Sequence, residues 1–423
     1  MNWFELLDAV TIVALVLGVN KKYGSPLNPV ALNGGFCFVS YIIGSSVFRA
    51  LGLVQISKHI LDWSQILSTL SFLSFGVAYL LDFSPFDGAL RFLRRCSSPF
   101  GAGVAVEKSG LAIPILLLEF CVAFLLLAAF SGAGLLWLSN PREAYQDHRS
   151  GVGVWWALSS AALYLAYFAF LLRHGKSVKR VFGGAFAFSA CSYVLGSKGL
   201  ILGYFLFGLL FVQYHLVRLS GRVVVLAGMS VAFAFIGLEI LFGAGSLVNA
   251  VLYFDYMPNT QQFLDSPEFS FQNGRLTLSS LWLYVPRALY PAKPHAYGAA
   301  AIDDMMDPGS SEEGHTAGLT GWVIPYTDFG VAGVVFFAVF EAWVSKAAFE
   351  LFLREKSLIS FALAGQIGFP FGLTVFYNAP FPVFWLWLIL HGAVVGLLTL
   401  AGGASRSPVA GPVDLPLLTS RRA

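Results

Sequence analysis

Long apolar runs separated by short polar segments make up most of this chain. A window of about 19 residues finds about eleven runs that approach the roughly 20 apolar residues a helix needs to cross hydrocarbon. We therefore predict an all-α polytopic membrane protein with about 11 transmembrane helices. The predicted helices lie near 3–20, 30–53, 60–81, 111–138, 152–172, 181–196, 199–216, 223–243, 322–345, 357–377 and 380–402.

The longest break in this pattern is the polar stretch 243–321, which lies between the eighth and ninth predicted helices. We predict a single transmembrane domain over residues 1–400, with this loop inserted into it. Residues 401–423 are rich in Gly, Ser and Pro, a composition typical of a disordered tail.

Composition supports the membrane prediction and excludes several function classes. The chain is 57% hydrophobic and only 12% charged, far from the average soluble domain. Its net charge of +3 is small and its basic residues are scattered, which argues against nucleic acid as a partner. No phosphate-binding loop or dinucleotide fingerprint occurs, and none of the four cysteines falls in 243–321, so no disulfide framework or metal knuckle is available there; we expect no cofactor and no metal.

The positive charges predict how the helices are oriented. Short cytoplasmic loops are enriched in Lys and Arg, and an alternating topology puts all but eight of the 26 basic residues inside. The N-terminus and loop 243–321 are then outside, which is the periplasm of a bacterium, and the C-terminal tail is in the cytoplasm. The N-terminus lacks the positive region of a cleaved signal peptide, so we expect the first helix to be retained.

Lys198 lies in Gly196-Ser197-Lys198-Gly199, at the outer junction of the sixth and seventh predicted helices. A lysine at a helix end is often there only to reach the membrane surface. Here the flanking small residues, Ser197 among them, would let an anion approach the backbone N–H groups at the start of a helix. We interpret Lys198 as an anion-binding residue with Ser197 in support.

Arg287 and Lys293 lie in the outer loop within a frame of three prolines, Pro286, Pro291 and Pro294. Proline fixes φ and stiffens the backbone, so the two cations keep a set separation. A guanidinium suits bidentate capture of phosphate, and an ammonium acts as a point charge. With Lys198 and the weaker candidate Arg275, they form a predicted diphosphate-binding cluster; ordinary loop charge or attraction to lipid headgroups is the alternative.

Carboxylates and one histidine gather near the end of the loop, in the run 303–315. Such a run is by default a solvated loop, and its spacing does not match a calcium-binding EF-hand. Glu312, Glu313 or His315 could act as general base toward a sugar hydroxyl beside the cation cluster, and the sequence does not decide among them.

The segment Tyr326-Thr327-Asp328-Phe329-Gly330 opens the ninth predicted helix. Asp328 at a helix start suits an N-cap that also interacts with the helix dipole. Tyr326 and Asp328 are therefore supporting candidates for the site.

Two segments resemble the motifs of Wzy-type oligosaccharide repeat-unit polymerases, also called O-antigen polymerases. Residues 285–294, Val-Pro-Arg-Ala-Leu-Tyr-Pro-Ala-Lys-Pro, are followed about thirty residues later by Pro-Tyr-Thr-Asp-Phe-Gly-Val-Ala-Gly over 325–333. The pair resembles that family's PR-x-x-[WY]-P-x-KP and Y-x-[ND]-FG-x-x-G patterns. Ser197-Lys198-Gly199 is similar to its Ser-Arg-Gly motif, with Lys in place of Arg, which keeps the charge but loses the bidentate fork.

The resemblance implies an inner-membrane glycosyltransferase with a GT-C-like fold that works on the periplasmic side. Such an enzyme transfers a growing glycan from undecaprenyl diphosphate to a new undecaprenyl-diphosphate-linked oligosaccharide and releases the carrier. The implied partners are this lipid-linked substrate, the lipid bilayer, and a chain-length regulator and a flippase. A single displacement, without metal, would invert the anomeric centre.

Two alternatives remain open at the level of sequence. An O-antigen ligase would use the same donor with a different acceptor. A transporter or flippase for lipid-linked glycans would need a cation-lined cavity but no base; the concentration of polar residues in one outer loop argues against alternating access.

Overall fold

The computed structural model describes residues 3–53, 55–81, 112–148, 152–240, 255–267, 269–285, 290–309 and 318–365. Its regular elements are all helices over these ranges, and seven of them are long and apolar enough to cross a membrane. This confirms the prediction of an all-α polytopic membrane protein. The predicted helix at 380–402 and the tail 401–423 lie outside the described residues.

The seven spanning helices match predicted ones closely. They are α1 (Trp3–Tyr23), the continuous run α2, η1 and α3 (Pro29–Ala50), α4 (Lys58–Leu80), α7 (Ala112–Phe130), α10 (Gly153–His174), α12 with η3 (Lys198–Leu216) and α18 (Val323–Arg354). The remaining long apolar elements are α11 (Val178–Ser192), with the short 3₁₀ turn η2 (Tyr193–Leu195), and α13 (Gly221–Glu239). The helix α19 (Leu358–Leu363) starts where the tenth predicted helix starts.

The boundaries differ from the predictions in two helices. The helix predicted at 111–138 ends at Phe130, and the residues after it form a turn and the short helix α8 (Leu136–Ser139). The helix predicted at 322–345 continues to Arg354, because its polar end stays helical beyond the apolar window. Hydropathy detects the membrane-spanning portion of a helix and does not detect where the helix itself ends.

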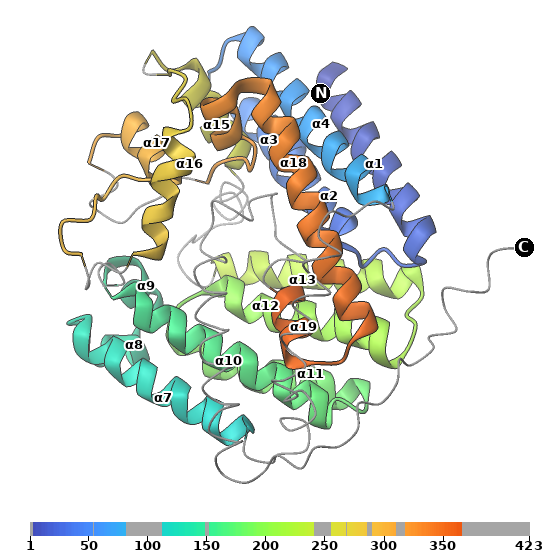
Figure 1. Cartoon of the computed structure of the whole chain (residues 1–423), viewed down its shortest axis with the longest axis vertical. Coiled ribbons are helices and arrows are strands. Elements are labelled where there is room, and N and C mark those ends of the chain that lie inside the picture. The colour runs from blue at the N-terminus through green and yellow to red at the C-terminus, as the bar shows by residue number, and fades with distance from the viewer. Residues whose placement is uncertain are drawn as a thin grey trace, which may run out of the picture.

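The helices form two groups (Figure 1). In one, α4 packs between α1 and α18; in the other, α10 packs against α7 and α11, and α11 against α12. Aromatic rings join the groups. Phe207 on α12 and His215 on η3 meet Phe352 on α18 with ring centroids 5.6 and 4.7 Å apart, and Phe168 on α10 meets Phe361 on α19 at 6.1 Å. Such ring contacts add specific geometry to apolar burial, which matters in lipid, where the hydrophobic effect between helices is small.

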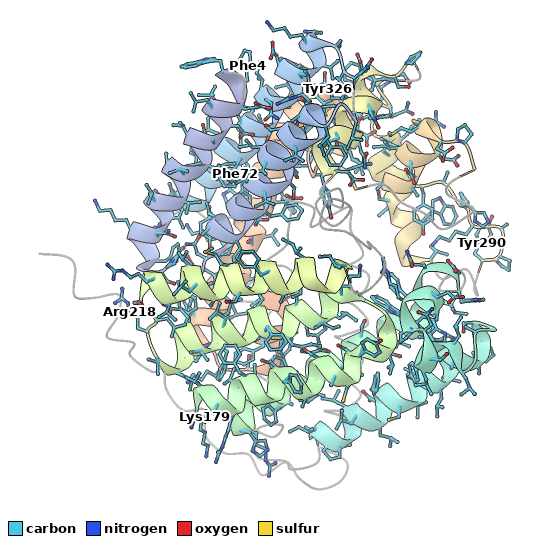
Figure 2. All side chains as sticks on the ribbon, turned by 180° about the vertical axis from the view of Figure 1, so that it is seen from behind. Phe4, Phe72, Lys179, Arg218, Tyr290 and Tyr326 are labelled. Atoms are coloured by element: carbon cyan, nitrogen blue, oxygen red, sulfur yellow. The ribbon has the colours of Figure 1, made fainter. Side chains whose placement is uncertain are left out.

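The loop helices and the basic loops lie at opposite ends of the molecule. In Figure 2, Tyr290 and Phe4 lie far from Lys179 and Arg218. At the basic end, Lys22 donates to Leu80 O at 2.9 Å, Arg218 donates to Gly24 O at 3.1 Å, and Lys346 donates to Leu81 O. Cations at helix C-termini satisfy free carbonyls and the negative end of the dipole. These basic residues therefore share one end of the bundle, and the side of the membrane that this end faces stays a prediction.

Candidate functional site

The described residues of the polar stretch between α13 and α18 fold into a cap of short helices on one end of the bundle. Its described residues form α15 (Tyr256–Asp265), α16 (Arg275–Ser279), the 3₁₀ helix η5 (Ser280–Tyr284) and α17 (Ala299–Met306). These elements lie toward the same edge of the molecule as α8 and α9 (Pro141–Asp147) in Figure 1. The cap and the junction before α12 are where the predicted site residues lie.

The helix α15 is fixed to the membrane bundle by buried polar contacts. Gln261 donates to Ser64 Oγ on α4 at 2.8 Å. Thr260 Oγ1 accepts from the backbone N–H of Thr320 at 2.9 Å, and Asn259 donates to Gly318 O at 3.1 Å. These partners lie on α4 and in the segment just before α18, so α15 is bonded both to the membrane bundle and to the last residues of the polar stretch.

Tyr326 is a structural anchor of this cap. Its hydroxyl accepts from Trp63 Nε1 on α4 at 2.8 Å, and its ring stacks on Phe269 at 6.2 Å with an 11° interplanar angle. Phe271 meets the same ring edge-on at 5.7 Å. Tyr326 thus joins α4, α18 and the segment before α16.

Asp328 caps a helix, but not the one that contains it. The sequence suggests an N-cap of its own helix; instead Asp328 lies within α18, and its carboxylate accepts from the N–H groups of Leu276 and Thr277 at 3.1 and 2.6 Å. Those two groups are free donors at the start of α16. Two positions later α18 kinks at Gly330, whose φ of 62° and ψ of −153° suit glycine alone.

Removing the Asp328 carboxylate should loosen α16. Asp328→Ala removes the acceptor of one buried and one partly buried backbone donor, which costs roughly 1–3 kcal/mol, and we expect faster hydrogen exchange at the amides of Leu276 and Thr277. Asp328→Asn keeps one acceptor oxygen and should have a smaller effect. Unchanged exchange in Asp328→Ala would show that the cap contributes nothing to holding α16.

Lys293 closes the segment that contains Arg287. Its ammonium donates to Val285 O at 3.1 Å and lies 4.5 Å from the centre of the Tyr297 ring, and its side chain is 8% exposed. The rings of Trp282 and Tyr290 stack with centroids 5.5 Å apart, so they also join the residues before and after this segment. The carbonyl and the ring hold the Lys293 ammonium beside Val285.

Lys198 is the first residue of α12 and is buried, with 7% exposure. Ser197 is the N-cap residue, and its side chain makes no capping bond to the described backbone. The junction is held from α9 and α10: Trp156 Nε1 donates to Leu195 O at 2.9 Å, and Arg142 donates to Gly196 O at 3.5 Å. A snorkelling lysine would extend to the surface, so burial argues against snorkelling, and anion binding by Lys198 stays a prediction.

Gly196 fixes this junction because no other residue fits. Its φ is 66°, and a Cβ there would lie 2.1 Å from Pro141 O. We expect Gly196→Ala to lower stability by at least about 1–3 kcal/mol, measured as a fall in the unfolding temperature in detergent. Gly199→Ala is the matched control, since its Cβ would meet only Ser197 Oγ at 3.9 Å. Equal unfolding temperatures for the two variants would contradict this assignment.

The other predicted site residues divide into two groups. Arg275 is exposed at the start of α16, so it is available to a ligand but held less firmly than the two lysines. Four of them lie outside the described residues: Arg287, Glu312, Glu313 and His315. Phosphate binding by Arg287, which we call the phosphate clamp, and the identity of the general base therefore remain predictions.

Sequence reasoning gave no site role to Arg142, which lies over the Tyr145 ring at 5.4 Å beside the Lys198 junction. It is one of the eight basic residues predicted outside, and that count was the one signal that could have marked it. Among the described residues no group of three or more His, Cys, Asp or Glu could hold a metal ion.

The fold defines a multi-pass membrane protein with a helical cap. Lys293 is buried in the cap, and Lys198 is buried at the start of α12. The chain is similar to O-antigen polymerases of Salmonella typhimurium and Salmonella typhi, with 24% identity over 207 residues in each case. The match covers 46% of this chain, and the chain spans about half (49%) of the length of these curated relatives. No family model matches the chain, and no solved structure matches it.

Proposed function

We propose that this protein polymerises undecaprenyl-diphosphate-linked oligosaccharide repeat units into a surface polysaccharide at the periplasmic face of the bacterial inner membrane. The observation that carries the proposal is the burial of two cations, Lys198 and Lys293, in the structures at the capped end of the bundle. An ammonium pairs with phosphate as a point charge, so a lipid-linked diphosphate is a ligand that suits these lysines. The similarity to O-antigen polymerases favours this ligand over others.

The proposed reaction is a single displacement that inverts the anomeric carbon. A hydroxyl of the incoming repeat unit attacks that carbon, the bond between the carbon and the diphosphate oxygen breaks, and undecaprenyl diphosphate leaves. Lys198, Lys293 and Arg287, with Arg275 at the rim, stabilise the negative charge that develops on the leaving group. Glu313, Glu312 or His315 accepts the proton from the attacking hydroxyl.

The cap geometry supports this division of roles. Lys293 is bonded to Val285, two positions from Arg287, and α16 with Arg275 is held by Asp328. Charged groups fixed before the reaction need not reorganise when the leaving group develops its charge, so they stabilise the transition state more than mobile ones. In this arrangement the N-terminus and the cap face the periplasm and the C-terminus faces the cytoplasm.

Reconstitution tests the proposal directly. The purified protein in lipid vesicles, given a synthetic undecaprenyl-diphosphate repeat unit, should form a ladder of longer glycans and release one undecaprenyl diphosphate for each bond made, without added metal. Unchanged glycan that has crossed the bilayer would instead identify a transporter. Transfer only to an added lipid A-core acceptor, with no ladder, would identify a ligase.

A further inference from the structure

Asp8 is a buried acid in the first membrane helix that has no part in the proposed reaction. It is 0% exposed, and neither of its carboxylate oxygens has a hydrogen bond of normal geometry among the described residues, although the hydroxyls of Ser68 and Thr69 are close enough to interact with it. Its polar neighbours are the hydroxyls of Ser68 and Thr69 on α4 and the thiol of Cys37 on α2. A carboxylate in such surroundings is unstable unless a cation compensates its charge, and an acid inside a membrane segment is a functional candidate by default.

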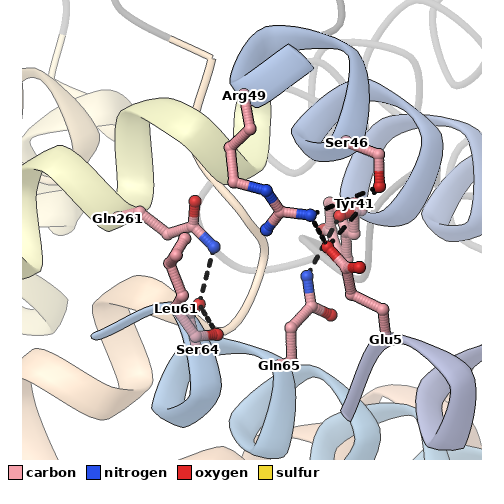
Figure 3. Close-up of polar contacts among 8 residues, drawn as sticks. All are labelled: Glu5, Tyr41, Ser46, Arg49, Leu61, Ser64, Gln65 and Gln261. Atoms are coloured by element: carbon pink, nitrogen blue, oxygen red, sulfur yellow. Dashed lines mark hydrogen bonds and ion pairs between the residues drawn. The ribbon is translucent and has the colours of Figure 1, made fainter. Parts of the chain in front are cut away.

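A layer of polar groups lies about one helical turn outward from Asp8. Glu5, three positions earlier on α1, forms an ion pair with Arg49 of α3, and Gln65 on α4 donates to Tyr41 O at 3.3 Å (Figure 3). Tyr41 O belongs to the π-helix η1 (Phe38–Ile43), where the wider winding alters the normal carbonyl pairing. The Arg49 side chain is 25% exposed, so it is the outermost group of this layer.

The same layer continues outward to the cap. Ser64, beside Gln65 on α4, accepts from Gln261 of α15, as Figure 3 shows, and Tyr41 Oη accepts from the N–H of Gly321 at 3.1 Å. Hydroxyl and amide groups therefore follow one another from α15 to the level of Glu5. Asp8 lies next in this series, on the same helix as Glu5.

An apolar layer closes the series on its inner side. A Cβ added at Gly34 would lie 2.9 Å from Phe72 Cζ and 3.1 Å from Ile12 Cγ2, so α2, α4 and α1 are in close contact there. Ile12 and Phe72 are each four residues further along their helices than Asp8 and Ser68, and both are buried. The polar series therefore ends at Asp8 and does not cross the membrane.

We propose that Asp8 binds one proton, which it exchanges with the capped side of the membrane alone. A neutral carboxylic acid can donate its O–H, and Thr69 Oγ1 is a buried hydroxyl oxygen with no other partner among the described residues. One proton thus resolves the charge of Asp8 and supplies both groups with a hydrogen bond. A metal ion would need several oxygen ligands, and the neighbours of Asp8 offer few.

The occupied site would act on the cap through α4. The helix that carries Ser68 and Thr69 also carries Trp63 and Ser64, which bond to Tyr326 and Gln261. The charge of Asp8 therefore bears on the helix that holds the proposed catalytic cap. Other titratable or charged groups that face this region are Cys37 on α2, Tyr41 on η1 and the ion pair of Glu5 with Arg49, with Glu341 on α18 and Tyr256 on α15 facing Tyr41.

Stability against pH tests the proton site. An aspartate in the unfolded chain loses its proton above about pH 3.9. In our proposal the native protein still holds the proton on Asp8 above that pH. The native state then binds more protons than the unfolded state, so the folding equilibrium constant should fall as pH rises, by up to about tenfold per pH unit. We expect this fall in detergent-purified protein between about pH 4 and the pH at which native Asp8 ionises, equally in sodium and choline chloride.

Two variants make the test specific. Asp8→Asn is a neutral isostere of the protonated acid and should lose this component of the pH dependence. Asp62→Asn should retain it, because Asp62 lies on α4 and is partly exposed. Equal pH dependence in the wild type and Asp8→Asn would overturn the proposal. The proposal would also be overturned if sodium stabilised the wild type more than choline did and Asp8→Asn abolished that difference. That result would show that Asp8 binds sodium.

Infrared spectroscopy gives a second readout if Asp8→Asn does not fold. The wild type should show the C=O band of a protonated buried carboxyl group, and Thr69→Val should move that band to higher wavenumber by removing its acceptor. Absence of the band near neutral pH, or a band that Thr69→Val leaves in place, would overturn the proposal. Neither result bears on polymer formation, which the reconstitution assay measures separately.

Discussion

Lys198→Met should reduce polymer formation by about 10²–10³-fold while the protein stays folded in the membrane. Methionine preserves most of the buried volume of the lysine side chain, so the change removes the charge and leaves the packing at the start of α12. Because the leaving diphosphate develops negative charge as the sugar is transferred, losing a buried cation there acts on the rate of bond formation. The measurement is the rate of ladder formation from a synthetic undecaprenyl-diphosphate repeat unit.

The control for this prediction is Lys179→Met. Lys179 is exposed on α11 at the end opposite the cap (Figure 2), so its loss should leave the rate unchanged. Lys198→Arg should retain part of the activity, since it keeps the charge and changes its geometry. Normal polymer yield in folded Lys198→Met would show that Lys198 does not bind the diphosphate.

Arg287→Ala should abolish chain growth, and Arg287→Lys should lose most of it. A guanidinium binds phosphate through two parallel hydrogen bonds, and an ammonium cannot reproduce that planar contact. Product length and yield in the same reconstituted assay measure both variants. We expect the Arg287→Ala protein to unfold at the same temperature as the wild type, because the clamp residue contributes to binding and not to the core.

Arg180→Ala is the matched arginine control, because Arg180 is exposed at the start of α11, on the basic end of the bundle. It should polymerise normally. If Arg287→Ala retains normal polymer length and yield, the phosphate clamp is not at Arg287. If both Arg287→Ala and Lys198→Met are active, the diphosphate is bound by other residues altogether.

Hydropathy was sufficient to predict the class and most of the helices, because crossing lipid requires a run of apolar residues long enough for a helix. The starts of α1, α4, α10 and α12 lie within a few residues of their predicted positions. The orientation that the charge pattern predicts, with the N-terminus and the loop outside, stays a prediction.

The candidate site was predictable only in part. Lys198 and Lys293 are both buried, and their role in binding an anion stays a prediction. The partner of Asp328 was not predictable, because it caps α16, about fifty residues earlier, and only the tertiary fold brings the two together. The same holds for Arg142, whose contact with Gly196 joins α9 to the start of α12.

The sequence by itself determined that this chain spans a membrane as helices, which segment lies between α13 and α18, and which cations that segment carries. Those properties follow from local composition, since hydrocarbon excludes charge and unpaired backbone wherever it meets the chain. The tertiary structure alone decided that the polar segment folds into a helical cap anchored by Trp63, Ser64 and Asp328. It also decided that Asp8 ends a polar series between α1, α2 and α4, because contacts between distant segments depend on how the helices pack and not on the residues next to them in the chain.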